Sequence, residues 1–164
     1  MRIQREFRAC STLLLLTFLL LLTCVSQAQK KSKYVCDESN PASLCTAANT
    51  CGSATAPCTI NINKSGSSST VKPSVPDAKN NQFFCVKTGT TVVWTTSNKN
   101  TGFMVSFGTD SPFDPDDPII GGANKPITAK ATTPGCYKYD AGAFYPGGIY
   151  GMSGGSKPEI VILP

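Results

Sequence analysis

Apolar and polar residues alternate in short runs along most of the chain after Cys58. The stretch GFMVSF is typical, because Phe103, Val105 and Phe107 fall on one face of an extended strand while Met104 and Ser106 fall on the other. Similar short segments read CTINI, TVKPSV, QFFCVKTGTTVVWTT, ITAKAT, CYKYDA and EIVIL. Turn residues separate them, and no long helical pattern is present. Several short strands at this spacing predict an all-β sandwich or barrel.

The segment 29–57 differs from the rest of the chain. It is rich in cysteine and has few large apolar residues, so it could not order itself by burial alone. We expect a disulfide-rich arm of loops with a short helical turn. The expected organisation is therefore a leader over 1–28, this arm over 29–57 and a β domain over 58–164.

The leader has the features of a secretory signal peptide. A basic start, MRIQREFR, precedes the apolar run Leu13–Leu22 and the small-residue pattern Ser26-Gln27-Ala28. The run is shorter than the roughly 20 residues that span a bilayer. We expect cleavage after Ala28 and a secreted or periplasmic protein without a membrane span. A membrane anchor and a lipoprotein cut before Cys24 are the alternatives.

The net charge and the residue composition limit the classes of function that we expect for this chain. Removing the leader's net charge of +2 from the formal +5 leaves +3, without the basic stripe that nucleic-acid binding needs. The chain contains no histidine, so no imidazole can act as the base for a serine nucleophile. We therefore expect neither a nucleic-acid partner nor an enzyme.

An even number of cysteines in an exported chain predicts disulfides. Their intervals over the arm are eight, five and six intervening residues, unlike the close pairs of zinc or iron–sulfur sites. The sequence does not determine how they pair. The six cysteines after the leader are Cys36, Cys45, Cys51, Cys58, Cys85 and Cys136.

Four segments occur in an order that resembles the cupredoxin family, the blue-copper β-sandwich. They are VKTGTTVVW, GFMVSF, GCYKYDA and GMSG, the last shortly before EIVIL. The resemblance covers about Thr59 to Pro164. It implies a Greek-key β-sandwich or barrel of cupredoxin type.

The resemblance also implies where copper ligands would lie. The first histidine of the family falls near Gly102 or Phe103, the cysteine at Ala141, the second histidine near Gly147 and the methionine at Met152. A blue-copper centre depends on two imidazoles and a thiolate. We therefore expect no cofactor and only vestigial ligand positions. The alternative is a copper carrier or electron-transfer protein with atypical ligation, using Met152, Met104 and a free cysteine.

By the same resemblance, Cys85 and Cys136 face outward on strands that a third strand separates. This implies that both bond to cysteines of the arm and fasten it over one sheet. The alternative is a direct Cys85–Cys136 bridge with the arm closed on itself.

The segment Phe144 to Tyr150 carries aromatic residues among glycines. In copper proteins of this family this loop docks partners, so Phe144, Tyr145 and Tyr150 are a candidate partner surface; alternatively the rings fold inward. The acidic loop Asp110 to Asp117 could instead bind calcium, as in an adhesion module. We expect a secreted cupredoxin-like binding or structural module that meets an extracytoplasmic protein or surface component.

Overall fold

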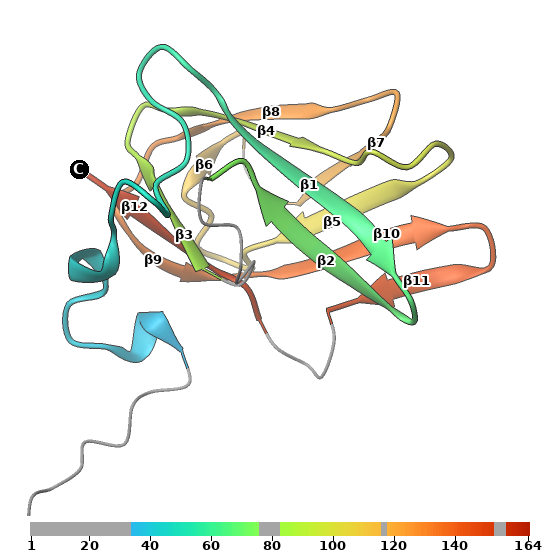
Figure 1. The fold of residues 1–164 in the computed structure, drawn as a ribbon, viewed down its shortest axis with the longest axis horizontal. Coiled ribbons are helices and arrows are strands. Elements are labelled where there is room, and N and C mark those ends of the chain that lie inside the picture. The colour runs from blue at the N-terminus through green and yellow to red at the C-terminus, as the bar shows by residue number, and fades with distance from the viewer. Residues whose placement is uncertain (1–33, 76–82, 116–117, 153–156) are drawn as a thin grey trace, which may run out of the picture. The chain divides into compact units, whose positions relative to one another are not determined.

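The computed structural model describes residues 34–75, 83–115, 118–152 and 157–164 (Figure 1). The predicted signal peptide over 1–28 lies outside these residues, as do Asp116 and Asp117 of the acidic loop. No described helix is long and apolar enough to span a membrane.

The described chain is mostly strand, which confirms the all-β expectation. Two short 3-10 turns, η1 (Val35–Asp37) and η2 (Pro41–Leu44), are the helical elements of its arm. The strands follow in the order β1 (Cys58–Ser65), β2 (Ser68–Pro73), β3 (Phe83–Lys87), β4 (Thr91–Thr95), β5 (Gly102–Ser106), β6 (Phe113–Asp114), β7 (Ile119–Gly122), β8 (Ile127–Ala131), β9 (Gly135–Lys138), β10 (Asp140–Tyr145), β11 (Gly148–Gly151) and β12 (Glu159–Leu163).

The strands form three hydrogen-bonded sheets. Their orders are β2-β1-β4-β8-β6, β11-β10-β5-β7 and β3-β12-β9. Most neighbours are antiparallel, but β1 pairs with β4 and β3 pairs with β12 in parallel. Parallel neighbours need a crossover connection, so the chain must pass between sheets rather than meander within one.

The segment 135–145 links two of these sheets. Its first part, β9, pairs with β12, and its second part, β10, pairs with β5 and β11. At the junction the Tyr139 N–H donates to the carbonyl of Pro158 at 3.1 Å instead of joining a ladder. One nearly continuous strand therefore holds the two sheets together.

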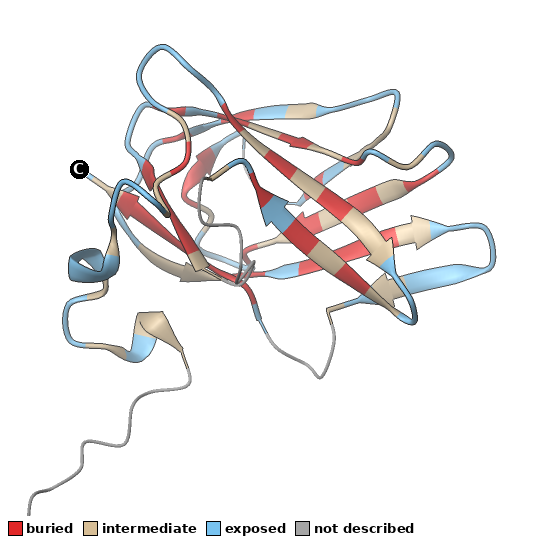
Figure 2. Cartoon of the chain, in the orientation of Figure 1, coloured by how far each residue is buried: buried red, intermediate tan, exposed pale blue. Residues whose placement is uncertain are grey.

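The core lies where the alternating apolar faces meet, as Figure 2 shows by the periodic burial along β1. Trp94 is fully buried and packs edge-on against Phe113 and Tyr139, each with a centroid distance of 5.9 Å. Phe103 and Val105 are also buried, which confirms the alternation predicted for GFMVSF. Such aromatic pairs add about 1 kcal/mol each beyond their buried area.

The core also contains polar groups without partners. The Trp94 indole N–H and the Tyr139 hydroxyl are both buried and have no hydrogen-bond partner in the described part of the chain. Burial strongly raises the pKa of Tyr139. The phenol therefore stays neutral and contributes to stability by packing.

The arm covers the free edge of β3. The Cys51 N–H donates to the Cys85 carbonyl at 2.7 Å, and the Cys85 N–H donates to the Asn49 carbonyl at 2.9 Å. These bonds form a short parallel bridge between Thr50 and Cys85. Exposed strand edges invite pairing with other chains, so the arm protects this edge from such contacts.

Candidate functional site

All six cysteines of the described residues form disulfides. The pairs are Cys36–Cys136, Cys45–Cys85 and Cys51–Cys58, with Cα–Cα distances of 5.3, 5.9 and 5.1 Å. The first two join the arm to β9 and β3. The arm-bound arrangement is therefore present, and the alternative Cys85–Cys136 bridge is wrong. Three disulfides indicate an oxidising, extracytoplasmic setting.

The strand register explains this pairing. Val161 of β12 is the Cα partner of Cys85 on one side and of Cys136 on the other. The three residues form one row on the face of the sheet away from the core. Phe84 and Val86, which flank Cys85 in β3, point to the opposite face and into the core. Cys85 is nevertheless fully buried, because the arm to which it is bonded covers this face.

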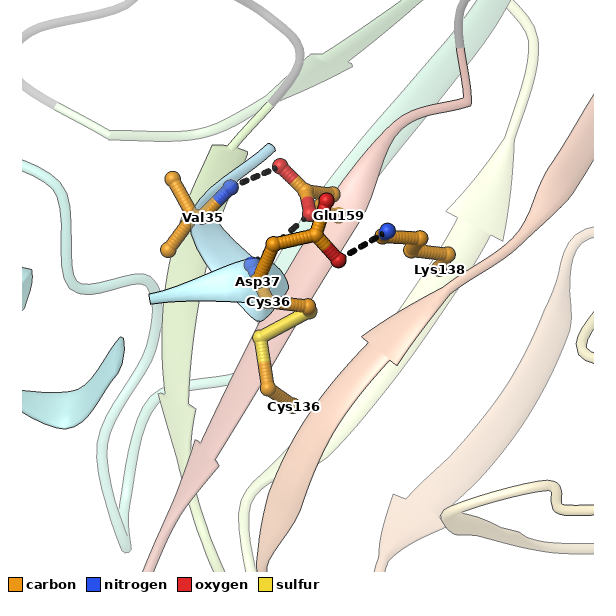
Figure 3. A network of polar contacts seen from close by, with 6 residues as sticks. All are labelled: Val35, Cys36, Asp37, Cys136, Lys138 and Glu159. Atoms are coloured by element: carbon orange, nitrogen blue, oxygen red, sulfur yellow. Dashed lines mark hydrogen bonds and ion pairs between the residues drawn. A yellow bond between two sulfur atoms is a disulfide. The ribbon is translucent and has the colours of Figure 1, made fainter. Parts of the chain in front are cut away.

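Glu159 holds the start of the arm through two backbone hydrogen bonds (Figure 3). Its carboxylate accepts from the Val35 N–H at 2.7 Å and from the Cys36 N–H at 2.9 Å. The side chain is buried at 4% exposure. A buried carboxylate costs free energy unless hydrogen bonds satisfy it, so the arm's backbone and Glu159 stabilise each other.

Lys138 adds an outer contact to the same attachment. Its ammonium donates to Asp37 Oδ1 at 2.5 Å and lies 4.3 Å from the centroid of the Tyr34 ring. The hydrogen bond to Asp37 raises the pKa of Lys138. Because both partners of this ion pair are partly exposed, it positions the arm more than it stabilises it.

Three of the four predicted vestigial positions lie on the core side of the β10–β5 sheet. Phe103 and Ala141 are buried on adjacent strands, and Met152 packs against the same core. The Ser69 hydroxyl lies 3.4 Å from the Ala141 carbonyl and 3.6 Å from the Met152 sulfur. Met152 is thus placed to fill space, a common role of methionine.

The fourth position, Gly147, does not join them. The segment expected to be a ligand loop is a hairpin in which Tyr145 pairs with Gly148, so Gly147 lies in its turn. Strand residues rise about 3.4 Å each, which puts the turn about 14 Å or more along the strand from Ala141. Gly147 therefore lies apart from the other three implied ligand positions.

The donors of the alternative copper site do not converge either. Met152 lies on the core side of the β10–β5 sheet, whereas Met104 alternates with the buried Phe103 and Val105 and points to the other face. No described cysteine has a free thiol. Within the described ranges, no group of three or more histidine, cysteine or acidic residues could hold a metal ion.

The β10–β11 hairpin divides the predicted aromatic surface between its two sides. Tyr145 and Tyr150 share one side, where the Lys64 ammonium lies 5.0 Å from the Tyr145 ring centroid and 4.2 Å from that of Tyr150. Phe144 points to the other side, opposite Ile149 in the register. Ile149 is 73% exposed and Tyr145 is 38% exposed. The three rings therefore neither all turn inward nor all lie on one exposed side of the hairpin.

Lys64 and Ile149 were not predicted as site residues from the sequence. Cys58, Ile60 and Ile62 alternate on the inner face of β1, and the same alternation predicts that the Lys64 side chain lies on this face. Its two ring partners lie some 80 residues later in the chain. No sequence pattern predicted the exposure of Ile149, because this exposure results from its position on the β10–β11 hairpin.

The acidic loop does not gather its described carboxylates. Asp114 is exposed on β6, and Asp110 lines a shallow groove with Thr133 and Tyr137. Burial, and to a lesser degree the Asp110 charge, raises the pKa of Tyr137. The other two carboxylates of the predicted calcium loop are outside the described residues.

Comparisons with models of known families, with curated proteins and with solved structures find no match.

Proposed function

We propose that this chain is a secreted, cupredoxin-like binding module without a type 1 copper site, and that it engages an extracytoplasmic protein or surface component through its β10–β11 hairpin. One observation carries the proposal. Where the resemblance would put a ligand loop, the chain forms a hairpin with Ile149 and Tyr145 exposed at its end. Exposed isoleucine and tyrosine side chains are suited to a contact surface.

Further features support the cupredoxin type. Two parallel strand pairs, β1–β4 and β3–β12, and a strand shared between sheets are compatible with a two-sheet sandwich with crossovers. The described residues of the segments on which the resemblance rests lie on or beside β3 to β5 and β9 to β12. The Greek-key assignment remains part of this proposal.

The second candidate, a copper protein with atypical ligation, lacks an observation in its favour. It needs a thiolate, but the described cysteines are all oxidised, and Met104 and Met152 lie on opposite faces of one sheet. A single thioether is a weak ligand. We therefore propose no cofactor and no enzymatic reaction.

The test compares two exposed isoleucines at opposite edges of the same sheet. Ile149 lies on β11 and Ile120, which is 53% exposed, lies on β7. The oxidised chain is used to capture ligands from the exterior fraction of the cells that produce it. Ile149→Asp should abolish specific capture, whereas Ile120→Asp should leave it unchanged. Equal loss in both variants, or no loss in either, would contradict a hairpin-centred surface.

A further inference from the structure

The inner side of the β10–β11 hairpin carries a cation that forms no ion pair with a described carboxylate. Lys64 lies near the end of β1 and reaches across to two tyrosine rings of the other sheet. We infer that Lys64, Tyr145 and Tyr150, together the Lys–Tyr cluster, bind the carboxylate-bearing sugars of an acidic polysaccharide. This inference rests on the proposed function and names the ligand class for its hairpin.

The positive charge of Lys64 is not paired with a carboxylate among the described residues. The described residues include two ion pairs, Lys138–Asp37 and Lys157–Asp140, and Lys64 belongs to neither. Asp140, the acidic residue of β10, is engaged by Lys157 at 2.8 Å. The two rings attract the ammonium through their negative faces, which positions the charge without neutralising it. An anion can therefore approach the cluster without displacing a carboxylate of the described residues.

The second step concerns hydrogen bonds. Neither the Tyr145 nor the Tyr150 hydroxyl has a hydrogen-bond partner among the residues that the structure describes, although neighbouring hydroxyls such as Ser69 do. An ammonium offers only donors, and a phenol can both donate and accept. A uronic acid carries a carboxylate beside the hydroxyls of its sugar ring, which matches one ammonium and two phenols. A glutamate side chain offers the carboxylate alone. This difference favours a uronic acid over an acidic peptide.

The third step concerns space. Gly148 faces Tyr145 in the hairpin register, and a Cβ added there would meet nothing closer than the Tyr150 ring at 3.9 Å. A Cβ added at Gly147 would meet nothing within 4 Å, and the φ of +102° at this residue favours glycine. The two glycines leave the approach to the tyrosine rings open. A sugar ring can reach the cluster from this side.

The experiment uses the oxidised chain after leader removal and immobilised polygalacturonate at low ionic strength. Methyl-esterified polygalacturonate has the same sugar backbone with its carboxylates masked, and poly-glutamate presents carboxylates without sugars. We expect binding to polygalacturonate that weakens as salt screens the charges, with little binding to either control polymer. Equal binding to the esterified polymer, or to poly-glutamate, would overturn the proposal in favour of neutral-glycan or acidic-peptide recognition.

Matched variants assign the binding to the cluster. Lys64→Gln should weaken it by about tenfold, as expected for the loss of a charge-assisted contact. Lys87→Gln removes the same charge from an exposed site on β3 and should leave affinity unchanged. Tyr145→Phe combined with Tyr150→Phe keeps the rings and should weaken binding by roughly 3–10-fold. Equal effects of the two lysine variants, or no effect of the tyrosine pair, would overturn the assignment.

The two proposals can fail separately. Absence of polygalacturonate binding, with capture that still depends on Ile149, would overturn the sugar assignment and leave the hairpin surface in place. Absence of both would contradict both proposals. Because the polymer comparison uses the unmodified chain, it decides the question even where a variant fails to fold.

Discussion

At the scale of single residues, two buried polar groups behave in opposite ways. The Glu159 carboxylate is buried but accepts two backbone hydrogen bonds, whereas the Tyr139 hydroxyl is buried without a described partner. Removing a satisfied acceptor leaves donors unpaired, while removing an unsatisfied group relieves a desolvation cost. Replacing Glu159 should therefore lower stability, whereas removing the Tyr139 hydroxyl should not.

Glu159→Gln should lower the free energy of unfolding by about 1–3 kcal/mol, because an amide oxygen can replace at most one of the two charge-assisted bonds. Urea unfolding measures the loss, and limited proteolysis should cut the arm faster. Asp140→Asn is the control, since its ion pair with Lys157 is exposed and should leave stability unchanged. Equal stability of the Glu159 variant and the parent chain would contradict the attachment described for the arm.

Tyr139→Phe should leave stability unchanged or raise it by about 1 kcal/mol, because it removes a buried hydroxyl without a described partner. Tyr137→Phe provides the comparison, since the Tyr137 hydroxyl donates to the Thr133 carbonyl at 3.1 Å and its loss should lower stability slightly. Both are measured by urea unfolding. A clear loss of stability in the Tyr139 variant would show that its hydroxyl has a partner.

At the scale of elements, the arm and the hairpin obtain their order by different means. The arm is held by Cys36–Cys136, Cys45–Cys85 and backbone bonds to β3. The hairpin is held by its pairing with β5 and by Lys64 from β1. Reduction should therefore affect the arm and leave the hairpin in place.

The disulfides should be reduced in order of access, because a thiolate must reach a sulfur atom. Both residues of Cys36–Cys136 are partly exposed, whereas Cys51 and Cys58 are fully buried. We expect Cys36–Cys136 to open first and Cys51–Cys58 last. Timed alkylation and peptide mass mapping follow the order. Early opening of Cys51–Cys58 would contradict the burial described here.

The sequence predicted elements better than it predicted the site. Alternation located the strands around Phe103 and Val86, and the cupredoxin resemblance implied the bonds of Cys85 and Cys136 to the arm, which the disulfides confirm. Gly147 lies apart from the other implied ligand positions, because the segment Phe144 to Tyr150, which the resemblance implies to be a loop, forms a hairpin. Pro146-Gly147-Gly148 is a turn signal that favours a hairpin. The contact of Lys64 with the rings could not be predicted, since it depends on how two sheets pack.

At the scale of the whole molecule, the residues at the positions implied for copper ligands have other roles. Ala141 and Phe103 are packed in the core, Gly147 forms a turn, and Met152 fills space beside Ser69. Disulfides join the arm to the β3–β12–β9 sheet and stabilise it. We propose that this β protein is a binding module whose described residues supply no strong copper donors.

The most direct measurement of that claim is a copper titration of the oxidised chain after leader removal. Cu(II) and then Cu(I) are added, the visible absorption is recorded, and affinity is determined by competition with a chelator of known strength. We expect no intense thiolate-to-copper band and no copper affinity that the Met152→Ala substitution lowers. A strong visible band, or tight binding abolished by Met152→Ala, would contradict the account and favour the copper-carrier or electron-transfer alternative.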